Sequence, residues 1–204
     1  SLKTLDCSKN KLSELNVSKQ KKLINLYCFK NNIKKLDVSN LKNLNELRCS
    51  YNGMKKLNIL KLKKLTWVEC SHNKLEILKF GNAKDLETLD CSYNQIIDLD
   101  VSKLNLIEFQ CQHNKLKKLD ISKMSLLEYA FNCSYNQLTE LKLGVKNILF
   151  SINCSHNQLK QLDISQCFGL VTIDCRNNQL TKLNTVNLKK LEKMKCDKGV
   201  ERII

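Results

Sequence analysis

The dominant feature of this chain is a set of apolar positions that recurs about every 21 residues. Ten cysteines are separated by 21, 21, 21, 21, 20, 22, 21, 21 and 21 residues, and they stand at Cys7, Cys28, Cys49, Cys70, Cys91, Cys111, Cys133, Cys154, Cys175 and Cys196. The residue two positions before each cysteine is always apolar, and further apolar columns follow five and eight positions after it. Self-similarity at one fixed period predicts a solenoid.

Each repeat has the layout of a leucine-rich repeat. Residues 86–101 read LETLDCSYNQIIDLDV, which matches LxxLxLxxNxL with cysteine in the third leucine position. Side chains alternate along a strand, so Leu89 and Cys91 should point inward and Asp90 outward. The sequence therefore predicts an α/β-class leucine-rich-repeat solenoid, with one curved parallel sheet of about ten short strands and a back of irregular or 3-10 turns.

We expect residues 1–204 to form a single domain of about ten 21-residue coils, because Pro is absent and no segment has the composition of a linker. Neither end of the sequence shows a full capping element, so terminal caps are expected to be missing or incomplete. The short step between Cys91 and Cys111 loses a residue near Asn105, and the long step to Cys133 gains one near Tyr129. The first should give a tighter back turn and the second a strand bulge or a displaced loop.

A column of asparagines lies three residues after the cysteines. Its members are Asn10, Asn31, Asn52, Asn73, Asn94, Asn114, Asn136, Asn157 and Asn178. An inward amide at the end of a strand can satisfy backbone groups that would otherwise be buried without partners. We therefore expect this column to be structural.

Eleven cysteines suggest redox chemistry or a metal site, but all of them fall in core columns, including Cys167, which shares a column with Leu41 and Leu188. A row of sulfurs about 4.8 Å apart cannot close around zinc and is too wide for relaxed disulfides. The triplet Cys70-Ser71-His72 also recurs, with the thiol facing the core, so it does not predict a catalytic pair. We therefore expect free buried thiols and no catalytic residue, metal or cofactor.

The net charge of +15 is not spread evenly over the predicted coil. The columns expected on the concave sheet face are the residues four, three and one before each cysteine and one and two after it. They hold eight basic and nine acidic residues. The excess of lysine therefore lies on the back and edges, as in Lys34-Lys35 and Lys55-Lys56. This distribution favours solubility, with polyanion binding through the back as the alternative.

Aromatic side chains gather on the concave face and at the strand exits. In the column two residues after the cysteine, Tyr and His alternate through the middle coils, and all three histidines are found there. Such side chains either form an interface or simply cover the turn. The candidate partner-binding residues are Tyr27, Phe29, Arg48, Tyr51, Trp67, Glu69, His72, Asp90, Tyr93, Gln110, His113, Tyr135 and His156.

The run C-S-x-N-x-L-x-x-L-D-V-S, at residues 91–102 and with Ile for Val at 154–165, resembles the cysteine-ladder repeats of internalin J and related bacterial leucine-rich-repeat proteins. The resemblance covers essentially the whole chain. It implies a secreted or cell-surface module for adhesion, host recognition and virulence, which binds a protein or glycan and is not an enzyme. The chain departs from this family in its lysine content. An intracellular (cytoplasmic) effector or regulatory scaffold stays open, as does a binder of nucleic acid or a heparin-like polyanion; no membrane insertion is expected.

Overall fold

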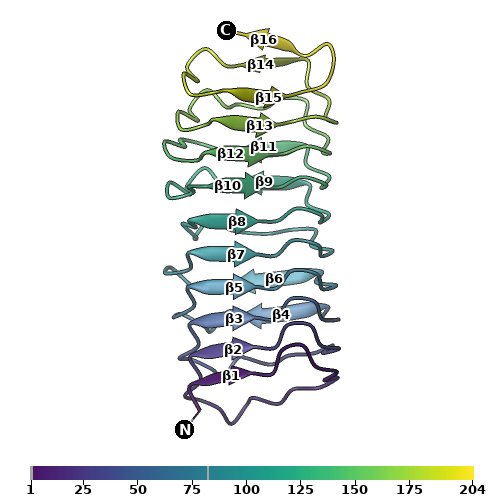
Figure 1. The fold of residues 1–204 in the computed structure, drawn as a ribbon, viewed down its shortest axis with the longest axis vertical. Coiled ribbons are helices and arrows are strands. Elements are labelled where there is room, and N and C mark those ends of the chain that lie inside the picture. The colour runs from purple at the N-terminus through teal and green to yellow at the C-terminus, as the bar shows by residue number, and fades with distance from the viewer. Residues whose placement is uncertain (1, 82) are drawn as a thin grey trace.

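The computed structural model describes residues 2–81 and 83–204, and it is a stack of coils that each contribute one strand to a single parallel sheet (Figure 1). The sheet has ten strands in the order β1-β2-β3-β5-β7-β8-β10-β12-β13-β15. Their bounds are β1 Thr4–Asp6, β2 Asn25–Tyr27, β3 Glu46–Arg48, β5 Trp67–Glu69, β7 Thr88–Asp90, β8 Glu108–Gln110, β10 Ala130–Asn132, β12 Ser151–Asn153, β13 Thr172–Asp174 and β15 Lys193–Lys195.

The register of this sheet places equivalent residues of successive coils side by side. Leu89 pairs with Val68 on one side and with Phe109 on the other. All three are fully buried, as is Cys91, while Asp90 is half-exposed. The alternation predicted from the sequence is therefore confirmed, and the stacked apolar columns form one continuous core.

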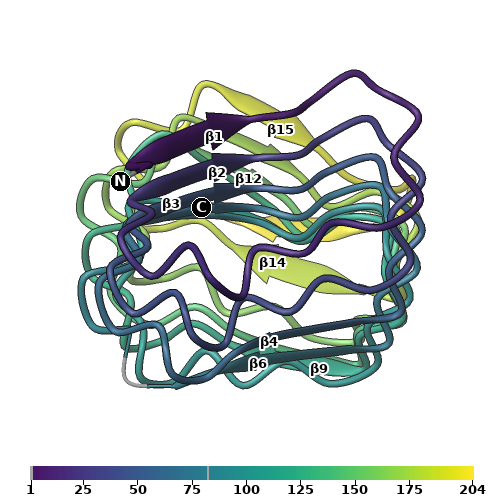
Figure 2. The ribbon, with the colours of Figure 1, turned by 90° about the horizontal axis from the view of Figure 1, so that it is seen from below.

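The back of the coils contains short strands in place of helices or 3-10 turns. Three two-stranded parallel sheets lie there, β4 (Lys56–Ile59) with β6 (Ile77–Phe80), β9 (Lys118–Asp120) with β11 (Glu140–Lys142), and β14 (Lys182–Asn184) with β16 (Glu201–Ile203). Figure 2, viewed along the stack, shows β4, β6 and β9 on the side opposite the ten-stranded sheet. The α/β label was thus wrong for the described residues, which contain no helix. The segments that connect one strand of the ten-stranded sheet to the next are too short and too extended to form a helix.

Both irregular coils behave as their spacing predicts. Several regular coils make two successive back turns, such as Leu41 N to Val38 O and Leu44 N to Leu41 O, at 3.0 and 2.9 Å. The short coil keeps the first of these, from Leu104 N to Val101 O at 3.0 Å. The missing residue thus falls on the back of the coil, and β8 keeps its register with β7.

The long coil carries its extra residue at the entrance to β10. Elsewhere one carbonyl accepts two consecutive amides of the next coil, as Phe150 O does from residues 171 and 172. Here two successive carbonyls each accept one amide: Phe150 N donates to Glu128 O at 2.7 Å, and Ser151 N donates to Tyr129 O at 3.0 Å. This arrangement is a strand bulge, and it leaves Tyr129 60% exposed.

One core position is filled by a lysine that the sequence patterns did not reveal. Lys146 stands in the column of Leu41, Met124 and Cys167, and it is fully buried. Its Nζ donates to the carbonyls of Leu143 and Ile121, the second at 3.1 Å. Burial lowers the pKa of this amine, since the charged form is desolvated.

Candidate functional site

The cysteine ladder forms the inner wall beneath the sheet, and its interior thiols are buried. Eight of its ten members are buried, and Cys7 and Cys196, in the terminal coils, are half-buried. The expectation that every ladder cysteine is buried was therefore wrong at the ends, where no neighbouring coil covers the thiol. Desolvation raises the pKa of Cys28 to about 12 and that of Cys167 to about 11, and no disulfide joins any of the eleven. A protonated, buried thiol is a poor nucleophile.

The asparagine ladder ties each coil to the one before it. Asn73 Nδ2 donates to the carbonyl oxygens of Cys49 and Cys70, both at 3.1 Å, and its Oδ1 accepts from Met54 N at 3.1 Å. The same pattern repeats from Asn31 to Asn178. The predicted structural role is confirmed. Asn10 differs because its amide bonds only to its own coil.

Five predicted site residues lie in one row across the ten-stranded sheet. Tyr27, Arg48, Glu69, Asp90 and Gln110 are consecutive register partners on β2, β3, β5, β7 and β8. Their side chains share the outer surface of the sheet, which we call the sheet face; it is the expected concave face. The row thus brings together side chains that are separated by 83 positions in sequence.

Arg48 is the centre of a compact cluster on the sheet face. Its guanidinium carbon lies 5.6 Å from the ring centroid of Tyr27 and 5.2 Å from that of Trp67. Its Nε donates to Glu46 Oε1 at 2.5 Å, and its Nη1 lies 3.8 Å from Glu69 Oε1. We call Tyr27, Glu46, Arg48, Trp67 and Glu69 the Arg48 cluster.

The two aromatic side chains of this cluster are also held by its carboxylates. Tyr27 Oη donates to Glu46 Oε2 at 2.7 Å, and Trp67 Nε1 donates to Glu69 Oε1 at 2.8 Å. The hydrogen bond to Glu46 is the main reason that the pKa of Tyr27 is raised. Each ring therefore has a fixed orientation while remaining half-exposed, which reduces the entropy lost on binding.

The Tyr and His side chains beyond the strands form a continuous stack. Tyr51, His72, Tyr93, His113, Tyr135 and His156 lie ring on ring, with centroids 4.0–4.3 Å apart and interplanar angles of 8–14°. Lys30 Nζ caps one end, 5.5 Å from the centroid of Tyr51. At the other end Asn177 Nδ2 lies 3.0 Å from His156 Nε2.

The backbone at this ring stack is left-handed. Its six residues have φ between 50° and 55°, a region that is uncommon for bulky side chains. Their faces are occupied by one another, so only ring edges are offered to solvent. The stacked rings therefore cover the strand exits, which is one of the two roles expected for them. They form a set distinct from the Arg48 cluster, although the sequence pattern grouped both as candidate binding residues.

Two further sets of residues lie outside the Arg48 cluster and the ring stack: the candidate Phe29, and the serines that directly follow the cysteines. Phe29 is half-buried with Lys9 Nζ 6.0 Å from its ring centroid. The sequence placed the residues just after the cysteines on the open sheet face, but the serines there are buried: Ser50, Ser71, Ser92, Ser134 and Ser155. These short side chains hydrogen-bond to neighbours, as Ser92 Oγ does to Asp90 Oδ1 at 2.6 Å. The assignment to the open face was wrong for these five serines, while Arg176 in the same column is exposed.

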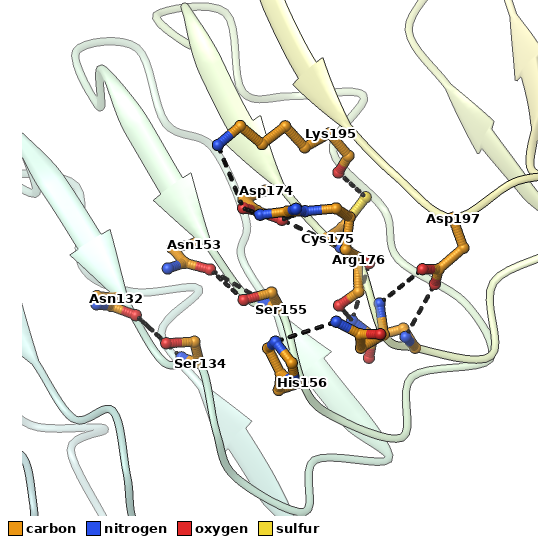
Figure 3. A network of polar contacts seen from close by, with 12 residues as sticks. Asn132, Ser134, Asn153, Ser155, His156, Asp174, Cys175, Arg176, Lys195 and Asp197 are labelled. Carbon is orange, nitrogen blue, oxygen red and sulfur yellow. Dashed lines mark hydrogen bonds and ion pairs between the residues drawn. The ribbon is translucent and has the colours of Figure 1, made fainter.

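At the C-terminal end the sheet face carries a second polar network, drawn in Figure 3. Arg176 donates to both oxygens of Asp174, at 3.0 and 2.7 Å, and Lys195 Nζ lies 4.0 Å from Asp174 Oδ2. These contacts, the Arg176 hydrogen bond above all, lower the pKa of Asp174. Asp197 accepts the backbone amides of Asn177 and Asn178. Its carboxylate thus replaces the backbone carbonyls that accept the equivalent amides of the preceding coil, those of His156 and Asn157.

Sequence reasoning missed Glu46 as a site residue. It stands two positions before Arg48 on the same strand, and residues two apart share a face, so this spacing was a usable signal. In residues 2–81 and 83–204, no group of three or more His, Cys, Asp or Glu side chains is arranged to hold a metal ion. The same residues contain no apolar helix of membrane-spanning length.

The fold, the 21-residue period and the asparagine and cysteine ladders together define a leucine-rich-repeat protein. Among solved structures, the functional domain of InlJ from Listeria monocytogenes, which includes a cysteine ladder, is 32% identical; the match covers 97% of this chain and 44% of that one, with a TM-score of 0.87. A leucine-rich-repeat protein of Leptospira interrogans is 25% identical over 99% of this chain and 56% of its own, with a TM-score of 0.82.

The internalin InlF of Listeria monocytogenes shares the fold, with 21% identity over 94% of this chain and 60% of its own and a TM-score of 0.77. No protein-family model and no curated protein matches the chain. The chain spans about half the length of the first two of these structures. It is a leucine-rich-repeat protein with a cysteine ladder, similar to InlJ over nearly all of its own length.

Proposed function

We propose that this chain is an interaction module that binds a protein partner on its sheet face, centred on the Arg48 cluster. The observation that carries the proposal is the position of the Arg48 guanidinium between the Tyr27 and Trp67 rings, each fixed by a carboxylate. Tyr, Trp and Arg are the residue types that dominate the binding energy of protein interfaces. The fixed, half-exposed geometry favours a preformed anchor site.

The charge around this cluster favours a partner surface that carries lysine or arginine. On coils three to six, the strands of the sheet face hold four carboxylates against the single guanidinium of Arg48. They are Glu46, Glu69, Asp90 and Glu108. Complementary charge speeds association and discriminates against wrong partners, while the aromatic anchors supply the affinity.

We further propose that residues 1–204 fold as one domain and that the protein acts at the cell surface or after secretion. The continuous pairing of the ten strands in one sheet supports the first point. The likeness to InlJ supports the second. A glycan partner and an intracellular role stay as alternatives. Protease treatment of intact cells, followed by detection of the protein, distinguishes a surface location from an intracellular one.

The binding proposal is tested with a surface-protein extract and two double variants. Arg48→Ala with Trp67→Ala removes the anchors, whereas Lys79→Ala with Ile97→Ala changes two exposed residues on the back. Partners are captured on the wild type, identified, purified and titrated. We expect the anchor variant to lose about 3 kcal/mol or more of binding free energy and the back variant to bind normally. Equal binding by both variants would contradict the proposal.

A further inference from the structure

A large hollow of the surface lies on the back of the coils, away from the Arg48 cluster. It is a groove of about 1150 Å³ that crosses the second, third and fourth coils. Five exposed lysines line it: Lys34, Lys35, Lys55, Lys56 and Lys74. We call this the lysine groove. Lys56 lies on β4, whose position opposite the ten-stranded sheet is visible in Figure 2.

The positive charge of the groove is not neutralised by the protein itself. None of the five lysines takes part in the ion pairs found among the described residues. The one carboxylate in the lining, Asp37, accepts hydrogen bonds from its neighbour Ser39, with a distance of 2.9 Å to the amide. Those bonds hold its pKa below the usual value, so it stays ionised and leaves a net charge of four. By contrast, Lys118 and Lys142, on the next part of the back, are both paired with Glu140.

Gly53 keeps the floor of the groove open. Its equivalents in the neighbouring coils are Asn32 and Lys74, so a side chain is missing from the middle of this column. The backbone does not demand glycine there, because a Cβ at Gly53 would meet Lys34 Cγ at an ordinary 3.7 Å and φ is not positive. The hollow therefore exists because position 53 has no side chain, and not because the backbone requires glycine there. A larger residue at this position could fill it.

The lining indicates which kind of anion fits. Lys34 and Lys55 occupy one position in successive coils, and Lys35 and Lys56 occupy the next, so the lysines follow two parallel rows on backbones about 4.8 Å apart. No aromatic side chain lines the groove, whereas single-stranded nucleic acid is held largely by stacking of bases on aromatic rings. The exposed amides of Asn32 and Asn58 suit hydroxyl groups. We propose that the lysine groove binds a sulfated polysaccharide.

This second site shares no residue with the Arg48 cluster and lies on a different surface of the molecule. A polysaccharide in the groove would leave the Arg48 cluster free for a protein partner. Binding should weaken steeply with salt, since each lysine that contacts a sulfate releases a counterion.

The test uses the whole chain and a heparin octasaccharide, titrated at several salt concentrations. In one variant the five groove lysines are changed to Gln; in the matched control, Lys103, Lys123, Lys160, Lys189 and Lys190, all exposed and outside the groove, are changed to Gln. We expect the groove variant to bind at least about tenfold more weakly, with a salt slope lower by about 3 or more, while the control changes little. Equal losses in both variants would show that net charge, and not the groove, is responsible.

Two further arms test the shape of the site and the choice of ligand. Gly53→Leu fills the floor without changing charge, and it should also weaken binding about tenfold while thermal unfolding shows an intact fold. Unchanged affinity in a folded Gly53→Leu chain would overturn the proposal. Desulfated heparin should not bind, and a single-stranded 12-nucleotide DNA should bind more weakly than the octasaccharide. DNA binding of equal or greater strength would refute the assignment to a sulfated polysaccharide.

Discussion

The side-chain amide of Asn73 donates a hydrogen bond to the carbonyl oxygen of Cys49, one coil earlier in the chain, at 3.1 Å. The same amide bonds to Cys70 of its own coil, so one side chain fastens two neighbouring strand ends. Because Asn73 is buried, water cannot replace these bonds. Coil stacking therefore depends on polar contacts as well as on the apolar core.

Changing Asn73 to Ala should lower the free energy of unfolding by about 2–4 kcal/mol, because buried carbonyls and the amide of Met54 lose their partners. Asn10→Ala is the matched control. Its amide is exposed and reaches only its own coil, so its loss should cost about 1 kcal/mol or less. Urea unfolding measures both values. Similar losses for the two variants would show that the bonds between coils contribute little.

We also expect the ring stack to contribute to the free energy of unfolding. His113 lies between Tyr93 and Tyr135, with centroids 4.3 Å from each. His113→Ala removes two stacking contacts and keeps a left-handed non-glycine residue, so we expect a loss of about 1–3 kcal/mol in the free energy of unfolding. His113→Phe retains the rings and should stay near the wild type. If the alanine variant is as stable as the phenylalanine variant, the rings do not support the strand exits.

The same histidine predicts a dependence on pH. Burial, followed by the nearby His156 and His72, lowers the pKa of His113 from its usual 6.5, so the folded state favours the neutral ring. The unfolded chain then binds the proton at higher pH, and the free energy of unfolding should fall as pH drops from about 7.5 through 6.5 and below. His113→Phe should reduce this slope. Melting curves between pH 7.5 and 5.5 test it, above the range where the carboxylates titrate; parallel curves for the two proteins would contradict it.

Thiol chemistry tests the ladder itself. Burial raises the pKa of the interior thiols, so the native protein should offer no more than two cysteines, the half-buried Cys7 and Cys196, to a thiol reagent. The denatured chain should show all eleven. Rapid labelling of Cys91 or Cys111 in the native state, located by mass spectrometry, would be inconsistent with the structure.

Much of the fold could be read from the sequence, because each core column repeats with the coil. The apolar position of Leu89 and the cysteine position of Cys91 each recur ten times, and the asparagine position of Asn94 recurs nine times. The two irregular coils were located from the spacing between successive cysteines. The burial of Lys146 was missed although it stands in the core column of Leu41 and Cys167, because a lysine is usually exposed. The left-handed conformation of Tyr93 and His113 was equally hidden, because these residue types rarely adopt it.

The candidate site was predictable only as a set of columns. Strand alternation placed Tyr27, Arg48 and Glu69 on one face. It did not show that Trp67 and Tyr27 would enclose Arg48, because side-chain torsions decide that arrangement. Nor did it separate the ring stack from the sheet face. Those distinctions depend on the path of the chain after each strand.

The most direct test of the central claim locates the partner on the molecule. A photo-crosslinking amino acid is placed at Asp90, on the sheet face beside the Arg48 cluster, or at Lys79, on the back, and each protein is irradiated with the purified partner. We predict crosslinks from position 90 that disappear when Arg48→Ala and Trp67→Ala are added, and none from position 79. Crosslinks from position 79 alone would place the partner on the back and contradict the account.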